Sequence, residues 1–415
     1  MKLDRASQPL AVLVDPIFAG VIVADEFLKH RRCIAVISKM SLEQALGYSF
    51  NPNVFEQVII ANEYRFEDLV AKFKDVDCDI VFSATEFGIE LTDQLSQALN
   101  LKGNDPSTSY LRRDKFAMVE AIRAAKIPAA AQVKTNLLNE AVKWLETNPC
   151  EKFVIKPVDS GGSDNVYICD NKADLAPCFR DILGTINILR CKNTHLLVQE
   201  YLEGQEYVIN TASLDGTHKL TDVWKVSKRL TEQGRNIYDF DDLCNPQDQE
   251  VQDLSQYINR VLDVLGVKTG AGHSEVIITR NGPYLIETAA RVSGAANPVA
   301  IQLATGSDQV ELASLAYLDE TDFSNRSQQY QLVKHARSVH IISSGNKTLS
   351  HEKFITFLSS LPSFVNINFR TKDGAVLTET VDVKTCPGAF FLVHEDKEII
   401  AEDYRQYRIW EAKNI

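Results

Sequence analysis

The sequence predicts an α/β protein built from about three packed units, and three observations support this fold class. The chain has 415 residues, and a domain commonly takes roughly 150 residues. Hydrophobic residues make up 45% of the chain and charged residues 24%, which is typical of soluble globular proteins. In the first hundred residues, short apolar runs alternate with segments of helical spacing, which is typical of a parallel sheet covered by helices.

The first unit, residues 1–105, is predicted to be a Rossmann-like domain. Its strands are expected at 9–14, 33–38, 57–61 and 79–83, and its helices at 17–30, 66–73 and 90–99. After the first strand the chain reads Asp15-Pro16-Ile17-Phe18-Ala19-Gly20 and lacks the G-x-G-x-x-G dinucleotide motif. The unit is therefore expected to bind a small substrate or to serve a structural role.

A linker helix is predicted over 106–126. The residues Asn104-Asp105-Pro106-Ser107 supply a turn and a cap, and helical spacing continues from about Ser107 to Ala125. Beyond it the pattern is mixed, with a helix near 139–147, strands at 153–156 and 166–169, and a helix after Asp174. A second mixed segment covers 195–293, and the chain from about residue 330 is predicted to be a small α+β tail.

The net charge and the spacing of the cysteines limit the classes of partner and the cellular compartment that the sequence favours. Lys and Arg total 44 and Asp and Glu total 56, which gives a formal net charge of -12. Nucleic acids and anionic membranes bind basic surfaces, so neither is expected as a partner. There is no membrane-length apolar run and no secretory signal pattern, and the eight cysteines show no zinc-ligand spacing. We therefore expect a cytoplasmic protein with reduced thiols.

A lysine followed by a glycine-rich loop forms the first of three informative segments. The apolar strand Phe153-Val154-Ile155-Lys156 ends in the lysine, and Ser160-Gly161-Gly162-Ser163 follows. Glycines let backbone N–H groups approach an anion, and a lysine adds positive charge, so the segment suits phosphate. It lacks the order of a Walker A loop. The alternative is a hairpin with a surface lysine.

The second segment runs from residue 197 to 208. Two apolar strands flank the bend Glu200-Tyr201-Leu202-Glu203-Gly204, and Glu206 follows it. Backbone groups at such a bend could meet a flat heterocycle, and a carboxylate could bind a ribose diol. Taken alone, the segment favours an ordinary connection between strands.

The third segment, residues 272–294, places one carboxylate in each of two apolar strands. Glu275 precedes Val276-Ile277-Ile278, and Glu287 follows Leu285-Ile286. A buried carboxylate is costly unless it is paired or binds a metal, and two of them near Arg291 suit Mg²⁺. The alternative is a pair of edge carboxylates in solvent.

The turn between these two strands decides whether the carboxylates can share a metal. A two-residue turn at Asn281-Gly282 would place them on opposite faces of the sheet. A three-residue loop, Arg280-Asn281-Gly282 with Gly282 in the left-handed conformation, would place Glu275 directly opposite Glu287. We predict the three-residue loop.

The three segments, in this order and at these separations, resemble the ATP-grasp superfamily. Within it, the chain is similar to carboxylate–amine ligases of the bacterial L-amino-acid ligase (dipeptide synthase) type, to about residue 320. The resemblance implies an ATP-grasp architecture. Its parts would be an N-terminal Rossmann-like domain at 1–105, a linker helix at 106–126, a lid at 127–202, a central subdomain with the metal site at 203–325, and an α+β C-terminal subdomain at 326–415.

The resemblance also implies a role for each matching residue. The nucleotide phosphates would be bound by Lys115, by Lys156 and by the flap Ser160–Asn165, which includes Ser160, Gly161, Gly162 and Ser163. The adenine would meet Glu200, Tyr201 and Leu202, and the ribose Glu206. The metal ligands would be Glu275 and Glu287. The catalytic groups would be Arg291, Lys156, Ser293, Gly294 and His273.

One position departs from the family pattern. Similar ligases often have Glu-x-Asn-x-Arg at the second metal ligand, and this chain has Glu287-Thr288-Ala289-Ala290-Arg291. Alanine has no side-chain oxygen, so one of two metal ions is expected to be held more weakly.

The implied reaction is an ATP-dependent, ADP-forming ligation. The carboxylate of an amino acid or similar small acid would attack ATP to give an acyl phosphate, and an amine would then form an amide or dipeptide. ATP and Mg²⁺, with Mn²⁺ possible, are the expected cofactors, and a homodimer acting on small zwitterionic or cationic amino acids is expected. The alternatives are an ATP-grasp ligase of purine or cofactor metabolism and a non-catalytic nucleotide-binding module.

Overall fold

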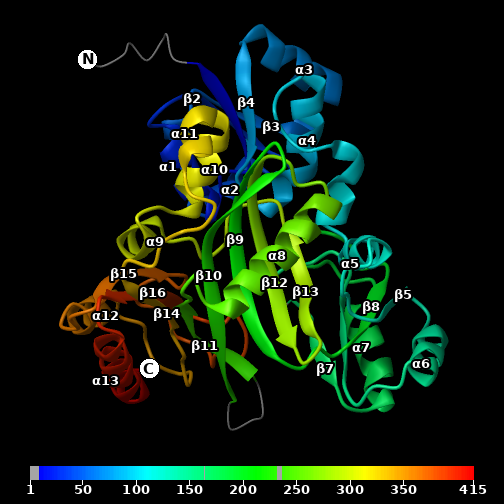
Figure 1. Cartoon of the computed structure of the whole chain (residues 1–415), viewed down its shortest axis with the longest axis vertical. Coiled ribbons are helices and arrows are strands. Elements are labelled where there is room, and N and C mark those ends of the chain that lie inside the picture. The colour runs from blue at the N-terminus through cyan, green and yellow to red at the C-terminus, as the bar shows by residue number, and fades with distance from the viewer. Residues whose placement is uncertain (1–8, 163, 231–235) are drawn as a thin grey trace.

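The computed structural model describes residues 9–162, 164–230 and 236–415, and it contains three sheets (Figure 1). The N-terminal sheet has the strand order β3-β2-β1-β4 and is parallel. Its strands are β1 (Leu10–Val14), β2 (Arg32–Ile37), β3 (Gln57–Ile60) and β4 (Cys78–Ser83). Its helices are α1 (Gly20–Phe27), α2 (Leu42–Leu46), α3 (Phe66–Asp75) and α4 (Ile89–Ala98). The strand order reverses beside β1, so the carboxyl ends of β1 and β4 flank the crevice where such sheets bind ligands.

The linker is broken, so the prediction of one continuous helix over 106–126 is wrong. It consists of the 3₁₀ helix η5 (Pro106–Arg112) and the α-helix α5 (Lys115–Ala124). Between them the side chain of Asp114 accepts a hydrogen bond from the Ala117 N–H at 2.9 Å and caps α5. An aspartate that can cap a helix competes with continuation of the preceding one. As a result Lys115 begins a new helix.

A buried arginine in the linker joins three parts of the chain. The Arg112 guanidinium is fully buried, contacts the Asp93 carboxylate at 2.6 Å and donates to the Leu265 carbonyl at 2.7 Å. Asp93 belongs to the N-terminal domain, and Leu265 follows α8 (Gln249–Val264) of the central sheet. A buried charge of this kind is tolerated because it is paired and hydrogen-bonded.

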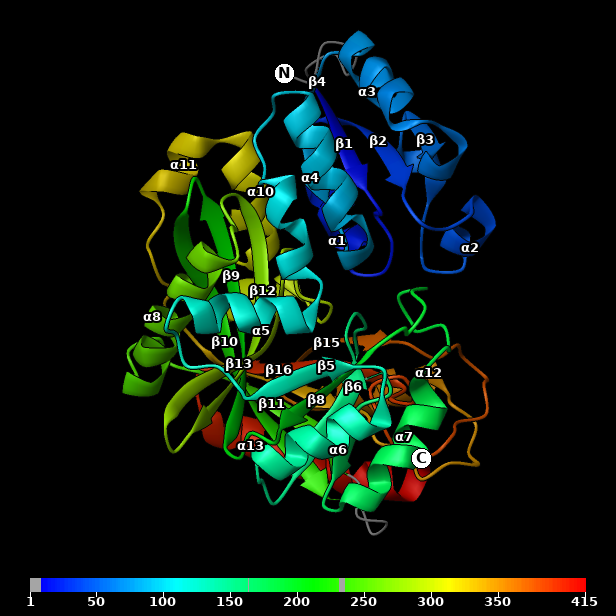
Figure 2. The same cartoon turned by 90° about the vertical axis from the view of Figure 1, so that its right-hand side faces the viewer.

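The lid sheet is antiparallel and has the order β5-β8-β6-β7. Its strands are β5 (Gln132–Thr135), β6 (Phe153–Pro157), β7 (Tyr167–Cys169) and β8 (Leu196–Glu200), and its helices are α6 (Leu138–Thr147) and α7 (Leu175–Ile182). Both helices bury an apolar face against this sheet. In Figure 2 the lid lies below the N-terminal sheet, and α5 lies at a height between them.

The third sheet has eight strands in the order β13-β12-β9-β10-β11-β14-β16-β15. Its first five strands in sheet order lie within residues 203–325, where the central subdomain is expected: β13 (Gly282–Ala289), β12 (Gly270–Thr279), β9 (Gln205–Leu214), β10 (Thr217–Leu230) and β11 (Asn236–Leu243). The other three, β14 (His335–His340), β16 (Gly388–His394) and β15 (Phe364–Phe369), come from the predicted tail. The tail therefore extends the central sheet and has no separate sheet within the described residues.

Helices cover both faces of this large sheet. They are α8, α9 (Pro298–Thr305), α10 (Gln309–Leu318), α11 (Glu320–Asn325), α12 (His351–Leu358) and α13 (Lys397–Asn414). Val251 and Leu254 of α8 pack in one core with Val276 and Leu285 of the sheet. Side chains alternate along a strand, so Glu275, next to Val276, points to the opposite face.

In the β12–β13 hairpin Glu275 pairs with Glu287 as predicted, but the turn differs from the predicted one. Thr279 pairs with Gly282, so the turn contains only Arg280 and Asn281, and the predicted three-residue loop is wrong. Gly282 has the expected positive φ, +99°. The register then shifts between Glu275 and Val276, where Ile286 is an extra residue, and Glu275 lies opposite Glu287 as predicted. A β-bulge rather than the turn therefore restores the register.

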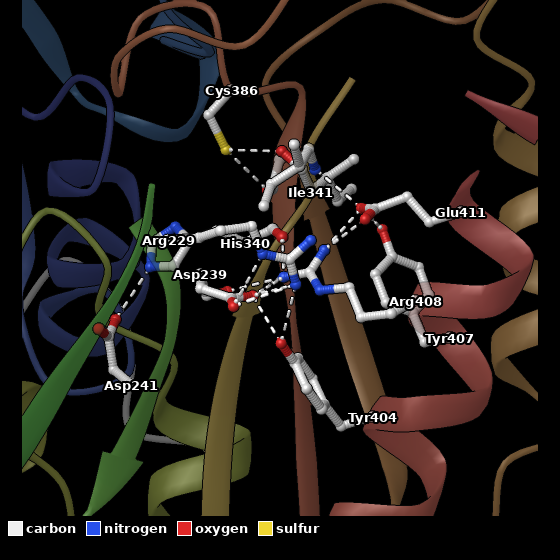
Figure 3. Close-up of polar contacts among 12 residues, drawn as sticks. Arg229, Asp239, Asp241, His340, Ile341, Cys386, Tyr404, Tyr407, Arg408 and Glu411 are labelled. Atoms are coloured by element: carbon white, nitrogen blue, oxygen red, sulfur yellow. Dashed lines mark hydrogen bonds and ion pairs between the residues drawn. The ribbon is translucent and has the colours of Figure 1, made fainter. Parts of the chain in front are cut away.

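A polar network joins the tail to the central sheet (Figure 3). Arg408 of α13 contacts Asp239 of β11 at 2.6 Å and Glu411 at 2.6 Å. The His340 Nε2 of β14 lies 2.9 Å from the Asp241 carboxylate of β11. These ion pairs fasten α13 and β14 to the edge of the central subdomain.

A loop of the lid docks on the N-terminal domain. This loop, residues 184–193, is closed by backbone hydrogen bonds from Gly184 to Asn193 at 2.8 Å and from Asn193 to Thr185 at 2.9 Å. Its Leu189 is only 6% exposed, and it packs in a cluster that includes Ile17 and Phe87 at the carboxyl edge of the N-terminal sheet. The lid and the N-terminal domain are thereby held together.

We expect Leu189→Ala to loosen this docking, because truncating a buried leucine typically costs about 2–5 kcal/mol. Limited proteolysis should then cleave the 184–193 loop faster than in the parent protein. Ile186 lies in the same loop, but it is 64% exposed, so Ile186→Ala is the matched control and should leave the cleavage rate unchanged. Equal cleavage rates in the two variants would contradict the docking role of Leu189.

We also expect His340→Gln to reduce stability more at pH 6 than at pH 9. Burial alone would lower the pKa of His340, but Asp241 outweighs burial and raises it from 6.5 to about 9. The folded state therefore holds the proton more tightly than the unfolded state. The ion pair contributes fully below pH 6.5, and its contribution is lost as the pH rises through 9.

A shift of this size corresponds to a contribution of at most about 3 kcal/mol. Urea unfolding at pH 6 and pH 9 measures the difference between parent and variant. His335→Gln, at the other end of β14, is the control. A His340→Gln penalty that does not shrink at pH 9 would contradict this assignment.

Candidate functional site

Two carboxylates face each other at the centre of the site. Glu275 of β12 and Glu287 of β13 are direct cross-strand partners on one face of the sheet. Burial, with the nearby charge of Glu287, raises the pKa of Glu275 to about 8. Burial acts on Glu287 too, but Lys115 outweighs it and holds the pKa of Glu287 below its ordinary value. Like charges so placed repel, and a cation between them would relieve the repulsion.

Two lysines from different elements meet this carboxylate pair. The Lys115 Nζ, from the first turn of α5, lies 2.8 Å from the Glu287 carboxylate and also donates to the Ser160 carbonyl. Lys156 of β6 is buried, and burial together with the charge of Lys115 lowers its pKa to about 8. Two ammonium groups beside two carboxylates form a site that can take an anion and a cation together.

The donor set fits a magnesium ion that is shared with a phosphate ligand. Mg²⁺ prefers oxygen ligands, keeps several waters and usually takes one or two protein carboxylates. Across residues 9–162, 164–230 and 236–415, no group of three or more His, Cys, Asp or Glu side chains is arranged to hold a metal ion. Glu275 and Glu287 alone would therefore need oxygens from a ligand to complete the coordination.

His273 lies two residues before Glu275 on the same face of β12. Its Nδ1 is 2.8 Å from the Asn210 Oδ1, and its Nε2 is 3.9 Å from the nearest Glu275 oxygen. Burial, aided by the nearby Arg291, lowers the pKa of His273 to about 3. The imidazole is therefore neutral at physiological pH.

In the predicted catalytic turn after β13, Ser293 forms hydrogen bonds with other residues of the chain. The Ser293 N–H donates to the Gln309 side chain at 2.8 Å, and the Ser293 hydroxyl accepts from the Ala295 N–H at 3.3 Å. Gly294 is exposed, and a methyl group added there would meet open space. Gly294 therefore leaves room for a ligand to approach the backbone.

The flap is anchored at both of its ends. The Ser160 hydroxyl donates to Asp164 at 2.9 Å, and Asp164 also contacts Lys384 of the tail at 2.5 Å. Gly161 and Gly162 lie between these anchors, and Gly162 has φ +61°, which favours glycine. Ser163 lies outside the described residues.

The bend after β8 is held by one hydrogen bond to a side chain and one between backbone groups. The Glu200 carboxylate accepts from the Ala131 N–H at 2.8 Å, and the Tyr201 N–H donates to the Lys152 carbonyl at 3.3 Å. Leu202 is buried. These contacts fix the bend at the lid boundary.

Glu206, the predicted ribose ligand, belongs to the same charged cluster. Its carboxylate lies 2.6 Å from the Lys228 Nζ and accepts from the Tyr238 hydroxyl at 3.3 Å. Lys228 therefore balances a third carboxylate on the face that carries Glu275.

Comparisons with known proteins bear on the fold of the chain. A family model described as an ATP-grasp domain matches residues 150–299, which contain Lys156, Glu206, Glu275, Glu287 and Arg291. The L-amino acid ligase from Bacillus licheniformis superposes with a TM-score of 0.75 at 16% identity, over 97% of each chain. Residues 150–299 contain an ATP-grasp domain.

Two further proteins are similar to this chain over most of its length. Dapdiamide A synthase from Enterobacter agglomerans is 29% identical over 89% of this chain and 92% of the relative. The biotin carboxylase domain of Hydrogenobacter thermophilus 2-oxoglutarate carboxylase, solved with MgADP, has a TM-score of 0.67 at 14% identity, over 95% of this chain and 88% of that chain.

The expected ATP-grasp fold is thereby confirmed, while the ligase activity and the roles of single residues stay predictions. Among the described residues, no helix is long and apolar enough to cross a membrane.

Sequence reasoning missed two residues that position the predicted arginine. Arg291 lies 3.3 Å from the carboxylate of Glu86, which follows β4, and Arg113 of the linker lies 3.2 Å from the same side chain. The signal was available, because Glu86 comes after a strand that borders the crevice of a parallel sheet. Arg113 gave no comparable signal, since it lies in a linker whose break was not predicted.

Proposed function

We propose that this protein joins the carboxylate of an amino acid or similar small acid to an amine, through an acyl phosphate and with release of ADP. The observation that carries the proposal is a cluster of opposite charges. Its positive groups, Lys115, Lys156 and Arg291, lie near two opposed carboxylates. These carboxylates belong to Glu275 and Glu287. Phosphoryl transfer needs charge neutralisation and positioning more than covalent help from the protein, and these residue types provide both.

Each group of residues has a part in this proposal. Lys115, Lys156 and the glycines of the flap bind the nucleotide phosphates, the bend at 200–202 meets the adenine, and Glu206 binds the ribose. Glu275 and Glu287 hold Mg²⁺, or Mn²⁺, which when bound neutralises the phosphate charge. Arg291 orients the transferred phosphoryl group, with Glu86 holding its guanidinium in place. Ser293 and Gly294 border the acyl phosphate.

Amino acids are the substrate class that best fits this chain. The names of two similar proteins, an L-amino acid ligase and dapdiamide A synthase, support small amino-acid substrates. The net charge of -12 also disfavours polyanionic acceptors. The purine-type ligase and the non-catalytic module gain no support from an observation of this site. The homodimer stays a prediction.

The test is product analysis with pairs of amino acids. We expect ADP and phosphate to be released in step with an amide, and AMP with pyrophosphate would contradict the proposal. Lys156→Ala should lower kcat/KM by at least about tenfold, which corresponds to about 1.4 kcal/mol of lost transition-state stabilisation. Lys143→Ala is the matched control, because Lys143 is an exposed lysine on α6 of the same lid. Equal loss in both variants would exclude a phosphate role for Lys156.

The alanine at position 289 leads us to predict how the reaction rate depends on the Mg²⁺ concentration. It lies opposite His273 in the hairpin, where similar ligases place an asparagine oxygen. We expect the enzyme to turn over with one ion held by both glutamates and a second held weakly. Ala289→Asn should therefore lower the Mg²⁺ concentration for half-maximal rate, and Glu287→Gln should abolish activity. An unchanged magnesium requirement in Ala289→Asn would show that another group already supplies the missing oxygen.

A further inference from the structure

Four charged side chains of alternating sign connect the lid to the predicted phosphoryl-binding arginine. The Asp159 carboxylate of the lid lies 2.8 Å from the Arg113 Nη2 in the linker. The Arg113 Nη1 lies 3.2 Å from one oxygen of Glu86, which follows β4 of the N-terminal domain. The other Glu86 oxygen lies 3.3 Å from the Nη2 of Arg291, which follows β13. The ion pairs therefore run without a break through four parts of the chain.

Arg113 is held at both of its terminal nitrogens. Its side chain is only 4% exposed, and a buried guanidinium is tolerated where it is paired and hydrogen-bonded. The Nη1 also donates to the Glu86 carbonyl at 2.9 Å, while the Nη2 donates to Asp159. A guanidinium is planar, so fixing two of its nitrogens fixes the whole plane. Asp159 therefore helps to set how Arg113 faces Glu86.

The Glu86 carboxylate is divided between two arginines. A carboxylate beside a single arginine can pair with it through both oxygens. Here Arg113 takes the Oε1, so only the Oε2 meets Arg291. Arg291 also donates from its Nη1 to the Val292 carbonyl at 3.2 Å, and among the described residues its Nε makes no hydrogen bond. Arg291 is thus held in place and keeps N–H groups for a ligand.

The flap lies beside this last ion pair. A methyl group added to Gly161 would be 3.8 Å from the Glu86 Oε2, the oxygen that meets Arg291. Asp159 directly precedes the flap, and its carbonyl accepts a hydrogen bond from the Asn187 side chain in the docked loop 184–193. The ion pairs therefore start at an anchored residue of the lid and end next to a glycine proposed to bind phosphate.

We propose that Asp159 and Arg113 are positioning residues, which act through Glu86 to orient Arg291 toward the transferred phosphoryl group. The inference rests on the proposed ligase function, in which Arg291 contacts that group. Arg113 limits Glu86 to one oxygen for Arg291, and Asp159 keeps Arg113 in the orientation that allows this division. Phosphoryl transfer depends steeply on the placement of such groups. The lid thereby contributes a carboxylate to the reaction in addition to its nucleotide contacts.

An ion pair that only fastened the lid would not need this arrangement. Asp159 is 35% exposed, and partly exposed ion pairs contribute little to stability because water screens them. The lid is already held by the buried Leu189 and by the contact of Lys384 with Asp164. What Asp159 adds is a partner for the buried arginine that contacts the carboxylate beside Arg291.

Three variants and one control test this chain of ion pairs. Asp159→Ala removes the carboxylate of the lid, Arg113→Lys replaces the fork by a single ammonium, and the third variant combines both changes. Asp170→Ala is the matched control, because Asp170 is an exposed lid aspartate that pairs with Lys152 at 3.7 Å. Nitrogen-15 spectra of arginine-labelled protein without substrates report whether rotation of the Arg291 guanidinium is restricted, and the Arg291→Lys spectrum assigns the signal.

We expect Asp159→Ala and Arg113→Lys to lose the restricted Arg291 signal and to lower kcat for ADP formation by about tenfold. KM for ATP should change by less than about twofold, because the phosphate-binding lysines are untouched. The double variant should lose no more than the larger single loss, since both changes break one chain. Asp170→Ala should keep the signal and the rate, and the 184–193 loop should be cleaved at the parent rate in every variant.

Three results would overturn the proposal. They are a restricted Arg291 signal that persists in Asp159→Ala, losses that add in the double variant, and faster cleavage of the 184–193 loop with a rise in KM for ATP, which would make Asp159 a fastener of the lid. If Arg113→Lys does not fold, Asp159→Ala decides through its spectrum and its kcat. A parent protein that releases no ADP with amino acids would instead refute the proposed function, since the spectra are recorded without substrates.

Discussion

The repulsion between Glu275 and Glu287 is the constraint on which the rest of the site depends. Two carboxylates held opposite each other in a hairpin cannot both be charged without a nearby cation. Lys115 and Lys156 supply fixed positive charge from two other elements. Their positive charge lessens the repulsion between the two carboxylates.

Two local features of the backbone bring these charged side chains together. The bulge at Ile286 brings Glu287 opposite Glu275, and the Asp114 cap restarts the helix so that Lys115 lies in its first turn. Each places one charged side chain, and a shift of one residue in the strand would turn its carboxylate to the other face.

The parts of the chain are held around the site by contacts far from it in sequence. Leu189 fastens the lid to the N-terminal domain, Lys384 of the tail reaches Asp164 of the flap, and Arg112 ties the linker to the central subdomain. Bringing such distant segments together costs chain entropy, and burial and pairing of these side chains offset that cost.

The sequence by itself determined the parallel N-terminal sheet and the ordered lysine, glycine-loop and carboxylate segments, because hydrophobic periodicity and charged residues in apolar strands are local signals. The ATP-grasp fold was implied by the resemblance of that ordered set to a known superfamily. The tertiary structure alone decided that the linker breaks at Asp114, that a bulge sets the hairpin register and that the tail continues the central sheet. It also decided that Glu86 meets Arg291 and that Asp159 meets Arg113. These pairings join residues far apart in the chain, and their energies depend on burial and on neighbours that no local pattern records.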